Sequence, residues 1–105
     1  MSQQIRTPEG YQAQGAQAAF TAAGTIQPGT TYASSTGGAD LTLPSAEAVG
    51  GTMIIVDNID GAATCNLVAS AGETIDGAAS VIVGAAATLV VFRTGATTLQ
   101  SGALS

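Results

Sequence analysis

The sequence has no histidine, no lysine, no tryptophan and a single cysteine. The missing imidazole excludes a Ser-His-Asp hydrolase, because that mechanism needs a histidine as its general base. One thiol and no imidazole also argue against a zinc site. Cys65 cannot form a disulfide within the chain, and its alternating run, Thr64-Cys65-Asn66-Leu67, favours a small buried hydrophobic residue over a reactive thiol. No cofactor is expected.

Charge is also scarce in this sequence. Charged residues make up 9% of the chain, against about 25% in soluble domains. Two cations, Arg6 and Arg93, stand against seven acidic residues, which gives a net charge of −5. Phosphate binding needs several Lys or Arg on one face, so nucleic acid is not expected as a partner. Arg93 ends an apolar run, where it either pairs with an acidic residue of a neighbouring chain or marks the point at which a strand meets solvent.

Long hydrophobic runs are missing too. No stretch reaches the ~20 apolar residues of a membrane-spanning helix. The first ten residues, MSQQIRTPEG, lack the charged and then apolar pattern of a signal peptide. Neither a membrane partner nor the ordinary secretion pathway is expected.

What the sequence does contain is largely Ala, Gly, Thr and Ser, in 105 residues, enough for one domain. Large apolar residues are few, and burying alanine adds little stability per residue. Domains of this size often gain stability from disulfides, metals or partner chains. Because the first two are disfavoured here, the composition favours oligomerisation.

The first 24 residues differ from the rest. The sequence TPEG is typical of the start of a helix, and strong helix formers follow it as far as Gly24. Between residues 11 and 24, Tyr11 and Phe20 are the only large apolar side chains, too few to stabilise a lone helix. We therefore expect residues 1–24 to form an arm, partly helical or extended, that binds another surface through Arg6, Tyr11 and Phe20. A frayed terminus is the alternative.

From residue 25 onward the pattern is that of strands. Runs of aliphatic and β-branched residues alternate with turn sequences such as Pro28-Gly29, Asp60-Gly61 and Asp76-Gly77. The run after Asp60-Gly61 is expected to pair back on the run before it. No amphipathic helix separates the strands, which disfavours parallel pairing. Residues 25–105 are therefore predicted to form one all-β domain, a compact antiparallel β-sandwich resembling a jelly roll.

Two of these runs are apolar on both sides of the pleat. Met53-Ile54-Ile55-Val56 and Leu89-Val90-Val91-Phe92 place large side chains on both faces, whereas a strand with one wet face alternates with polar residues. A neighbouring copy of the chain is the simplest cover for the second face. The residues expected to lie between copies of the chain are Met53, Ile55, Leu89, Val91 and Phe92.

Two acidic stretches are candidates for a catalytic or metal site. Glu73 and Asp76 lie three positions apart, but the sequence offers no His or Lys to work with them, and Asp76-Gly77 is typical of a tight turn. The chain is therefore not expected to be an enzyme. DNIDG, residues 57–61, is a faint match to an oxygen-ligand loop for calcium without the distal Glu of an EF-hand. A turn is favoured there, with a weak calcium site at Asp57 to Asp60 as the alternative.

Residues 39–95 contain four further elements in a fixed order. These are Leu43-Pro44, Gly51-Thr52 before an aliphatic strand, Asp57-Asn58 at its end, and Thr74-Ile75-Asp76-Gly77-Ala78-Ala79-Ser80. Together they resemble a β-module of tailed-bacteriophage virion proteins, found in tail fibres, head fibres and head decoration proteins. The Trp that often closes this module is absent, and FRTGATTL stands in its place.

The resemblance implies a homotrimeric, β-rich protein exposed on a virus particle. A short chain with an N-terminal arm fits a capsid decoration, or cement, protein better than a fibre with a long shaft. The expected function is that of a structural virion protein, in which trimers bind the major capsid protein on the outer capsid surface and stabilise contacts between capsid proteins. The arm, with Arg6, Tyr11 and Phe20, is then expected to bind the capsid. The alternative is a tail-fibre or head-fibre module that binds a receptor on the host surface.

Overall fold

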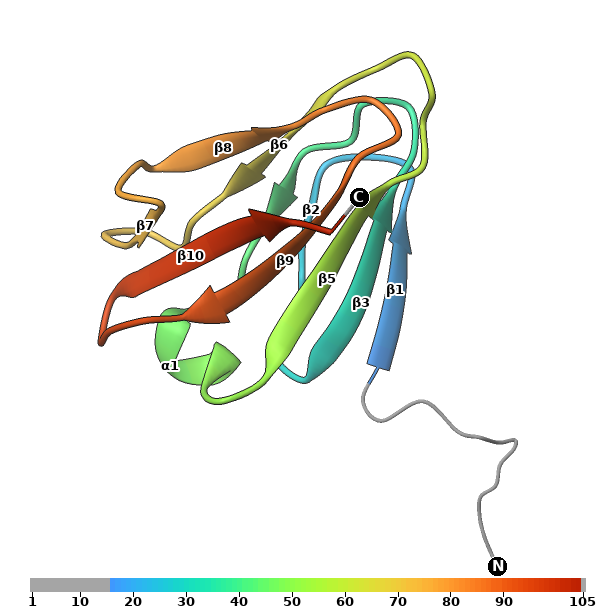
Figure 1. Cartoon of the computed structure of the whole chain (residues 1–105). Helices are drawn as coiled ribbons and strands as arrows, with labels where there is room; N and C mark the ends of the chain where they lie inside the picture. The colour runs from blue at the N-terminus through green and yellow to red at the C-terminus, as the bar shows by residue number, and fades with distance from the viewer. Residues whose placement is uncertain (1–15, 105) are drawn as a thin grey trace, which may run out of the picture.

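The structure, a computed structural model, describes residues 16–104. These residues form two sheets, one of six strands and one of four (Figure 1). The strand order is β1-β3-β5-β9-β10-β7 in the larger sheet and β2-β4-β6-β8 in the smaller one. The prediction of an all-β fold is confirmed.

Most strands are short, and their ends coincide with the turn residues of the sequence. The larger sheet contains β1 (Ala16–Phe20), β3 (Thr30–Ser35), β5 (Met53–Asn58), β7 (Thr74–Ile75), β9 (Thr88–Arg93) and β10 (Thr98–Ala103). The smaller sheet contains β2 (Gly24–Thr25), β4 (Leu41–Thr42), β6 (Cys65–Val68) and β8 (Ser80–Val83). A single turn of helix that the sequence analysis did not foresee, α1 (Ala46–Val49), connects β4 to β5.

The strand pairing differs from the predicted antiparallel arrangement. β1, β3 and β5 run parallel to one another, and so do β2, β4 and β6. β9 runs antiparallel to β5 and β10, and β8 antiparallel to β6. Parallel neighbours need a crossover connection, and here strands of the opposite sheet replace the helix that the sequence lacks: β2 connects β1 to β3, and β4 connects β3 to β5. The sheets are therefore mixed, and the expected hairpin at Asp60-Gly61 is wrong, since β5 and β6 lie in different sheets.

The hydrophobic core lies between the two sheets. Ile54, Val56 and Val91 of the larger sheet meet Leu41 and Leu67 of the smaller one, and all five side chains are buried. Burial of such side chains is the main source of stability in a domain of this size.

Cys65 belongs to the same core. Its side chain is 2% exposed, and burial raises the pKa of its thiol. A protonated, buried thiol behaves as a small hydrophobic group. The prediction for Cys65 is confirmed.

The segment expected to be an arm is partly a strand. Residues 16–20 form β1 and pair with β3, so the boundary expected at residue 24 falls inside the folded region, at the start of β2. Phe20 packs against the core, and a Cβ added to Gly24 would lie 2.7 Å from its ring. The backbone partners offered by β3 outweigh the helix propensity of this Ala-rich stretch, because propensity is a weak prior against tertiary context. Phe20 therefore packs, partly buried, against the core of its own chain, while Arg6 and Tyr11 lie outside the described residues.

Candidate functional site

Two exposed large apolar side chains, Met53 and Phe92, lie side by side on the face of the larger sheet that is turned away from the smaller sheet. Alternation along β5 buries Ile54 and leaves Met53 and Ile55 on this side. The strand register then places Phe92 beside Met53, and Val90 beside Ile55. Met53 is 58% exposed and Phe92 40% exposed. Tyr32 of β3 pairs with Ile55 and completes the group; we call these residues (Tyr32, Met53, Ile55, Val90 and Phe92) the outer-face patch.

The outer-face patch contains an open hollow of about 670 Å³. Its apolar walls come from β3, β5 and β9 and from Leu104, the residue after β10. Its polar groups lie on β1, on β3 and just before β5. The lining residues are Gln17, Thr31, Tyr32, Gly51, Thr52, Met53, Ile55, Val90 and Leu104.

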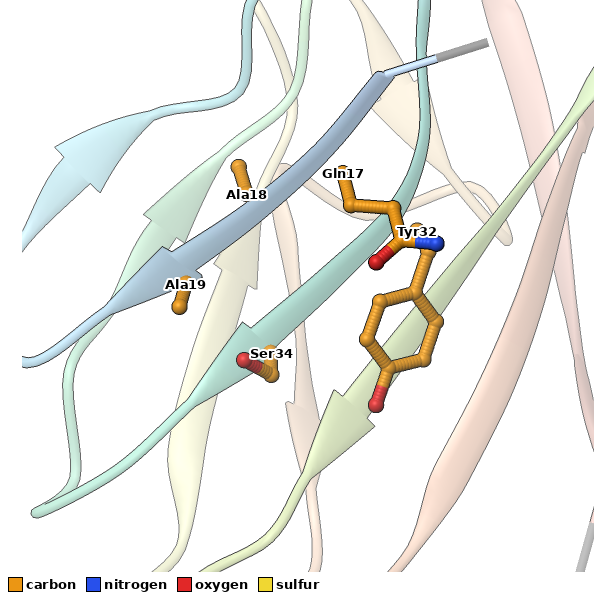
Figure 2. A pocket seen from close by; sticks show the side chains of 5 residues that line it. All are labelled: Gln17, Ala18, Ala19, Tyr32 and Ser34. Carbon is orange, nitrogen blue, oxygen red and sulfur yellow. The ribbon is translucent and has the colours of Figure 1, made fainter. Parts of the chain in front are cut away.

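A smaller hollow of about 340 Å³ continues the surface toward the edge strand β1. Figure 2 shows the five residues that line it, Gln17, Ala18 and Ala19 on β1 and Tyr32 and Ser34 on β3. Gln17 and Tyr32 line both hollows and are partners in the register of β1 and β3. The two hollows therefore meet at Tyr32.

A hydrogen-bonded carboxylate borders the outer-face patch. Asp57 lies two residues beyond Ile55 on β5, and its Oδ2 accepts a hydrogen bond of 2.7 Å from the Tyr32 hydroxyl. Its Oδ1 accepts one of 3.1 Å from Thr88 Oγ1. The bond to Asp57 raises the pKa of Tyr32, with burial and the negative charge of Asp57 adding to the effect. These two bonds hold the carboxylate in place while leaving each oxygen a further lone pair for a donor from outside.

The structure divides the five residues that were expected to lie between copies. Met53, Ile55 and Phe92 lie on the outer face, as expected for a contact with another chain. Val91 is fully buried in the core and Leu89 packs against that core, so both stabilise the single chain. Strand alternation is the physical reason, because successive residues along β9 point to opposite sides of the sheet, so that Leu89 and Val91 face the core when Phe92 faces outward.

Val90 takes the place of these two residues on the outer face. Its position could not be read from a run that is apolar at every residue. The strand register places Val90 on the outer face. Met53 pairs with Phe92, and two residues further along the antiparallel pair Ile55 therefore lies opposite Val90.

The outer face of the smaller sheet is more polar. Ile82 is 69% exposed there, but its cross-strand partner is Asn66. Two positions along, Val68 pairs with Ser80 on β8 and with Thr42 on β4. The apolar surface is therefore specific to the larger sheet.

Glu73 and Asp76 accept hydrogen bonds from backbone N–H groups of two different elements. Glu73 Oε1 accepts a hydrogen bond of 2.8 Å from the Ala46 N–H at the start of α1. Asp76 and Gly77 have φ angles of 54° and 82°, and the flanking Ile75 and Ala78 exchange two backbone hydrogen bonds, as in a two-residue hairpin turn. Asp76 Oδ1 accepts a bond of 2.8 Å from the Ser101 N–H. The two carboxylates thus serve different elements, and the prediction of a turn at Asp76-Gly77 is confirmed.

The loop that resembles a calcium site is held by its own hydrogen bonds. Asp60 Oδ1 accepts bonds from the N–H groups of Ala62 and Ala63, and its Oδ2 accepts one from Gly37. These bonds, that of Ala62 first, lower the pKa of Asp60. Asp57 belongs instead to the outer face, so the acidic groups of this stretch do not converge. Within residues 16–104, no group of three or more His, Cys, Asp or Glu side chains is arranged to hold a metal ion.

Asn58, at the end of β5, is the largest buried polar side chain of this region. It is fully buried, and its Nδ2 donates to the carbonyl oxygens of Ala63 at 2.8 Å and Gly84 at 3.0 Å. Its Oδ1 accepts a bond of 3.2 Å from the Asp60 N–H. The side chain therefore joins the β5–β6 loop to the β8–β9 loop, a structural role that accounts for its place in the sequence.

Arg93 ends β9 at the surface, and its Nε donates a hydrogen bond of 2.8 Å to the Gly95 carbonyl oxygen. In the described part of the chain, no helix is long and apolar enough to span a membrane. Comparisons with known protein families, with curated proteins and with solved structures gave no match to this chain.

Proposed function

We propose that the chain is a structural virion protein, a bacteriophage capsid decoration protein that forms trimers through the outer-face patch and binds the outer surface of the capsid. The observation that carries this proposal is the outer-face patch itself. The inner face of the larger sheet is covered by the smaller sheet, whereas Met53 and Phe92 stand side by side at 58% and 40% exposure on the other. Contiguous exposed apolar surface of this kind marks interaction sites in soluble proteins.

The chemistry of the patch favours a protein partner over a substrate. Its members are apolar apart from the Tyr32 hydroxyl, which is already bonded to Asp57. Acid–base or nucleophilic catalysis needs reactive groups that converge on one point. In the described part of the chain, the carboxylates of Asp57, Asp60, Glu73 and Asp76 bond backbone groups or hydroxyls in separate places. A second copy of the chain, with its own apolar patch, is the simplest partner.

The virion assignment draws its support from the resemblance across residues 39–95. Its four elements occupy bends and strand ends: Leu43-Pro44 follows β4, Gly51-Thr52 precedes β5, Asp57-Asn58 ends β5, and the last element spans β7, its turn and the start of β8. Residues at such positions determine where the backbone turns, so the four elements that carry the resemblance lie where a change of sequence would alter the fold. The net charge of −5 suits a place outside the shell, away from packaged DNA.

The proposed mechanism is passive. Trimers bind neighbouring copies of the major capsid protein, and each added interface raises the free energy needed to separate them under internal pressure. An interface on the order of 1,600 Å² in total is sufficient for specific binding, and it is repeated over the whole shell.

Two measurements test the proposal. Sedimentation equilibrium of the purified chain should give three times the monomer mass, and quantified gels of virus particles from the same source should give hundreds of copies per particle. A folded monomer at micromolar concentration would overturn the trimer. A handful of copies per particle would overturn the decoration role and support a fibre module instead.

A further inference from the structure

The larger hollow on the outer face fits an extended peptide of a particular chemistry. Met53, Ile55, Val90 and Leu104 provide apolar walls along its length. The carboxylate of Asp57 lies beyond Ile55 on the same face of β5, oriented by two hydroxyl groups. A segment that fills this surface needs apolar side chains and one cation that can reach the carboxylate.

The chain itself contains one segment of this composition. Of its two cations, Arg93 lies at the end of β9 and bonds the Gly95 carbonyl. The other, Arg6, follows Ile5 directly and precedes Tyr11 by five positions. Residues 5–11 therefore combine two large apolar side chains with the only other positive charge of the protein.

The length of the N-terminal segment favours a neighbouring copy as its binding site. The segment enters the fold at Ala16, and Gln17 already lines the hollow of its own chain. Tyr32 lies one strand away from Gln17 and Ile55 two strands away, roughly 10 Å across the sheet. Ten extended residues, from Arg6 to Ala16, span roughly 33–36 Å, far more than this short distance requires. That reach matches the 34 Å middle dimension of the molecule, so the segment can cross from one chain to the hollow of the next.

We infer that the hollow of the outer face receives the N-terminal segment, residues 1–15, of a neighbouring copy, with Arg6 pairing to Asp57 and with Ile5 and Tyr11 against the apolar walls. The inference rests on the proposed function only in that copies of the chain associate. Each chain in a closed ring gives one segment and receives one, so every hollow is filled. An arginine can form two parallel hydrogen bonds with a carboxylate, which fixes the register of the segment as well as its affinity.

Disulfide trapping between two versions of the full chain tests this inference. One version carries Ile5→Cys, and the other carries Thr52→Cys at the wall of the hollow together with a mass tag. Ser80→Cys, exposed on β8 of the smaller sheet, replaces Thr52→Cys in the matched control. Cys65 is buried, so the unmodified chain serves as a blank. After mixing and mild oxidation, we expect a covalent pair of tagged and untagged chains with Thr52→Cys and at least tenfold less with Ser80→Cys.

The same assay tests the ion pair. Asp57→Asn should lower the yield of the covalent pair about tenfold, as expected for the loss of one charge-assisted hydrogen-bonding partner, whereas Asp40→Asn, at an acidic residue that bonds the Asn66 N–H, should leave it unchanged. Exchanging the charges, with Arg6→Asp in one version and Asp57→Arg in the other, should restore the yield.

Three results would overturn the inference. The first is equal yields with Thr52→Cys and Ser80→Cys. The second concerns a third version that carries both Ile5→Cys and Thr52→Cys: a disulfide that forms only within this chain, and never between chains. The third is an Asp57→Asn variant that traps as well as the parent. If one of these occurs while sedimentation still gives a trimer, the proposed function stands without the exchange of segments. A monomeric parent chain would instead remove the proposed function itself.

Discussion

Replacing Phe92 with serine tests whether the outer-face patch joins copies of the chain. Phe92 is 40% exposed, and a phenylalanine side chain has roughly 200 Å² of surface, which leaves about 80 Å² for a partner to cover. At about 25 cal/mol per Å², covering this area contributes about 2 kcal/mol per chain. The rest of the side chain, about 120 Å², is covered within the single chain, so the substitution should also lower the free energy of unfolding of the single chain, by up to about 3 kcal/mol.

The expected effect on assembly is larger than on folding. Three copies of Phe92 are lost from a trimer, so its dissociation free energy should fall by about 6 kcal/mol, a factor of roughly 10⁴ in the dissociation constant. Because three chains separate together, the concentration at half-dissociation follows the square root of that constant. Phe92→Ser should therefore raise this concentration by about 100-fold.

Sedimentation velocity over a dilution series measures that concentration directly. Ile82→Ser is the matched control, because Ile82 is 69% exposed but lies on the smaller sheet. This substitution should leave the half-dissociation concentration unchanged. The buried area of Phe92 predicts a shift of about 100-fold in the half-dissociation concentration. A shift of less than about threefold for Phe92→Ser would refute the proposal that the outer-face patch joins copies of the chain. An equal shift in the Ile82→Ser protein would do the same, because the effect would then not be specific to the larger sheet.

Three further predictions concern the fold. Val91→Ala should lower the free energy of unfolding in urea by about 2 kcal/mol, because Val91 is fully buried, and it should leave the half-dissociation concentration unchanged. Asn58→Ala should cost about 2 kcal/mol in the same experiment, since it removes a fully buried side chain and its hydrogen bonds to the partly buried carbonyl oxygens of Ala63 and Gly84. Asn66→Ala at an exposed position should cost less than about 0.5 kcal/mol. Asp60 has a pKa below 3.8 in the folded chain because its carboxylate accepts three backbone hydrogen bonds. The ionised carboxylate therefore stabilises the fold at pH values above 3.8. The parent should be more stable than Asp60→Asn near neutral pH, and urea unfolding should show this difference disappear as the pH falls through the folded-state pKa.

The positions of the strands could be predicted from the sequence because local chemistry sets them. Proline cannot continue a central strand, and β4 ends just before Leu43-Pro44. Asp76-Gly77 adopts the positive φ angles that a tight hairpin turn needs. The aliphatic runs that became β5 and β9 end at Asn58 and Arg93, where the sequence turns polar. In each case the decisive residues are adjacent in the chain.

The pairing of the strands could not be predicted in the same way. β2 and β4 have two residues each, too few to show a hydrophobic period. β1 reads as AQAAF, a helix-forming sequence that becomes extended because β3 offers it backbone partners. The crossovers of the parallel strands run through the opposite sheet, and no residue pattern within a single strand records which sheet it joins.

The candidate site shows the same division between local and distant information. Four successive apolar residues in β5 (Met53–Val56) and in β9 (Leu89–Phe92) place large side chains on both faces of these strands, yet alternation alone could not say which half faces the core. The register with the neighbouring strands decides that, and it turns Val91 inward and Phe92 outward. Under the proposed assembly, adjacent residues of one strand belong to different equilibria, Val91 to the folding of the single chain and Phe92 to association between chains. Because the two can be altered separately, substitutions along β9 distinguish an assembly surface from an oversized core, which a sequence pattern by itself cannot do.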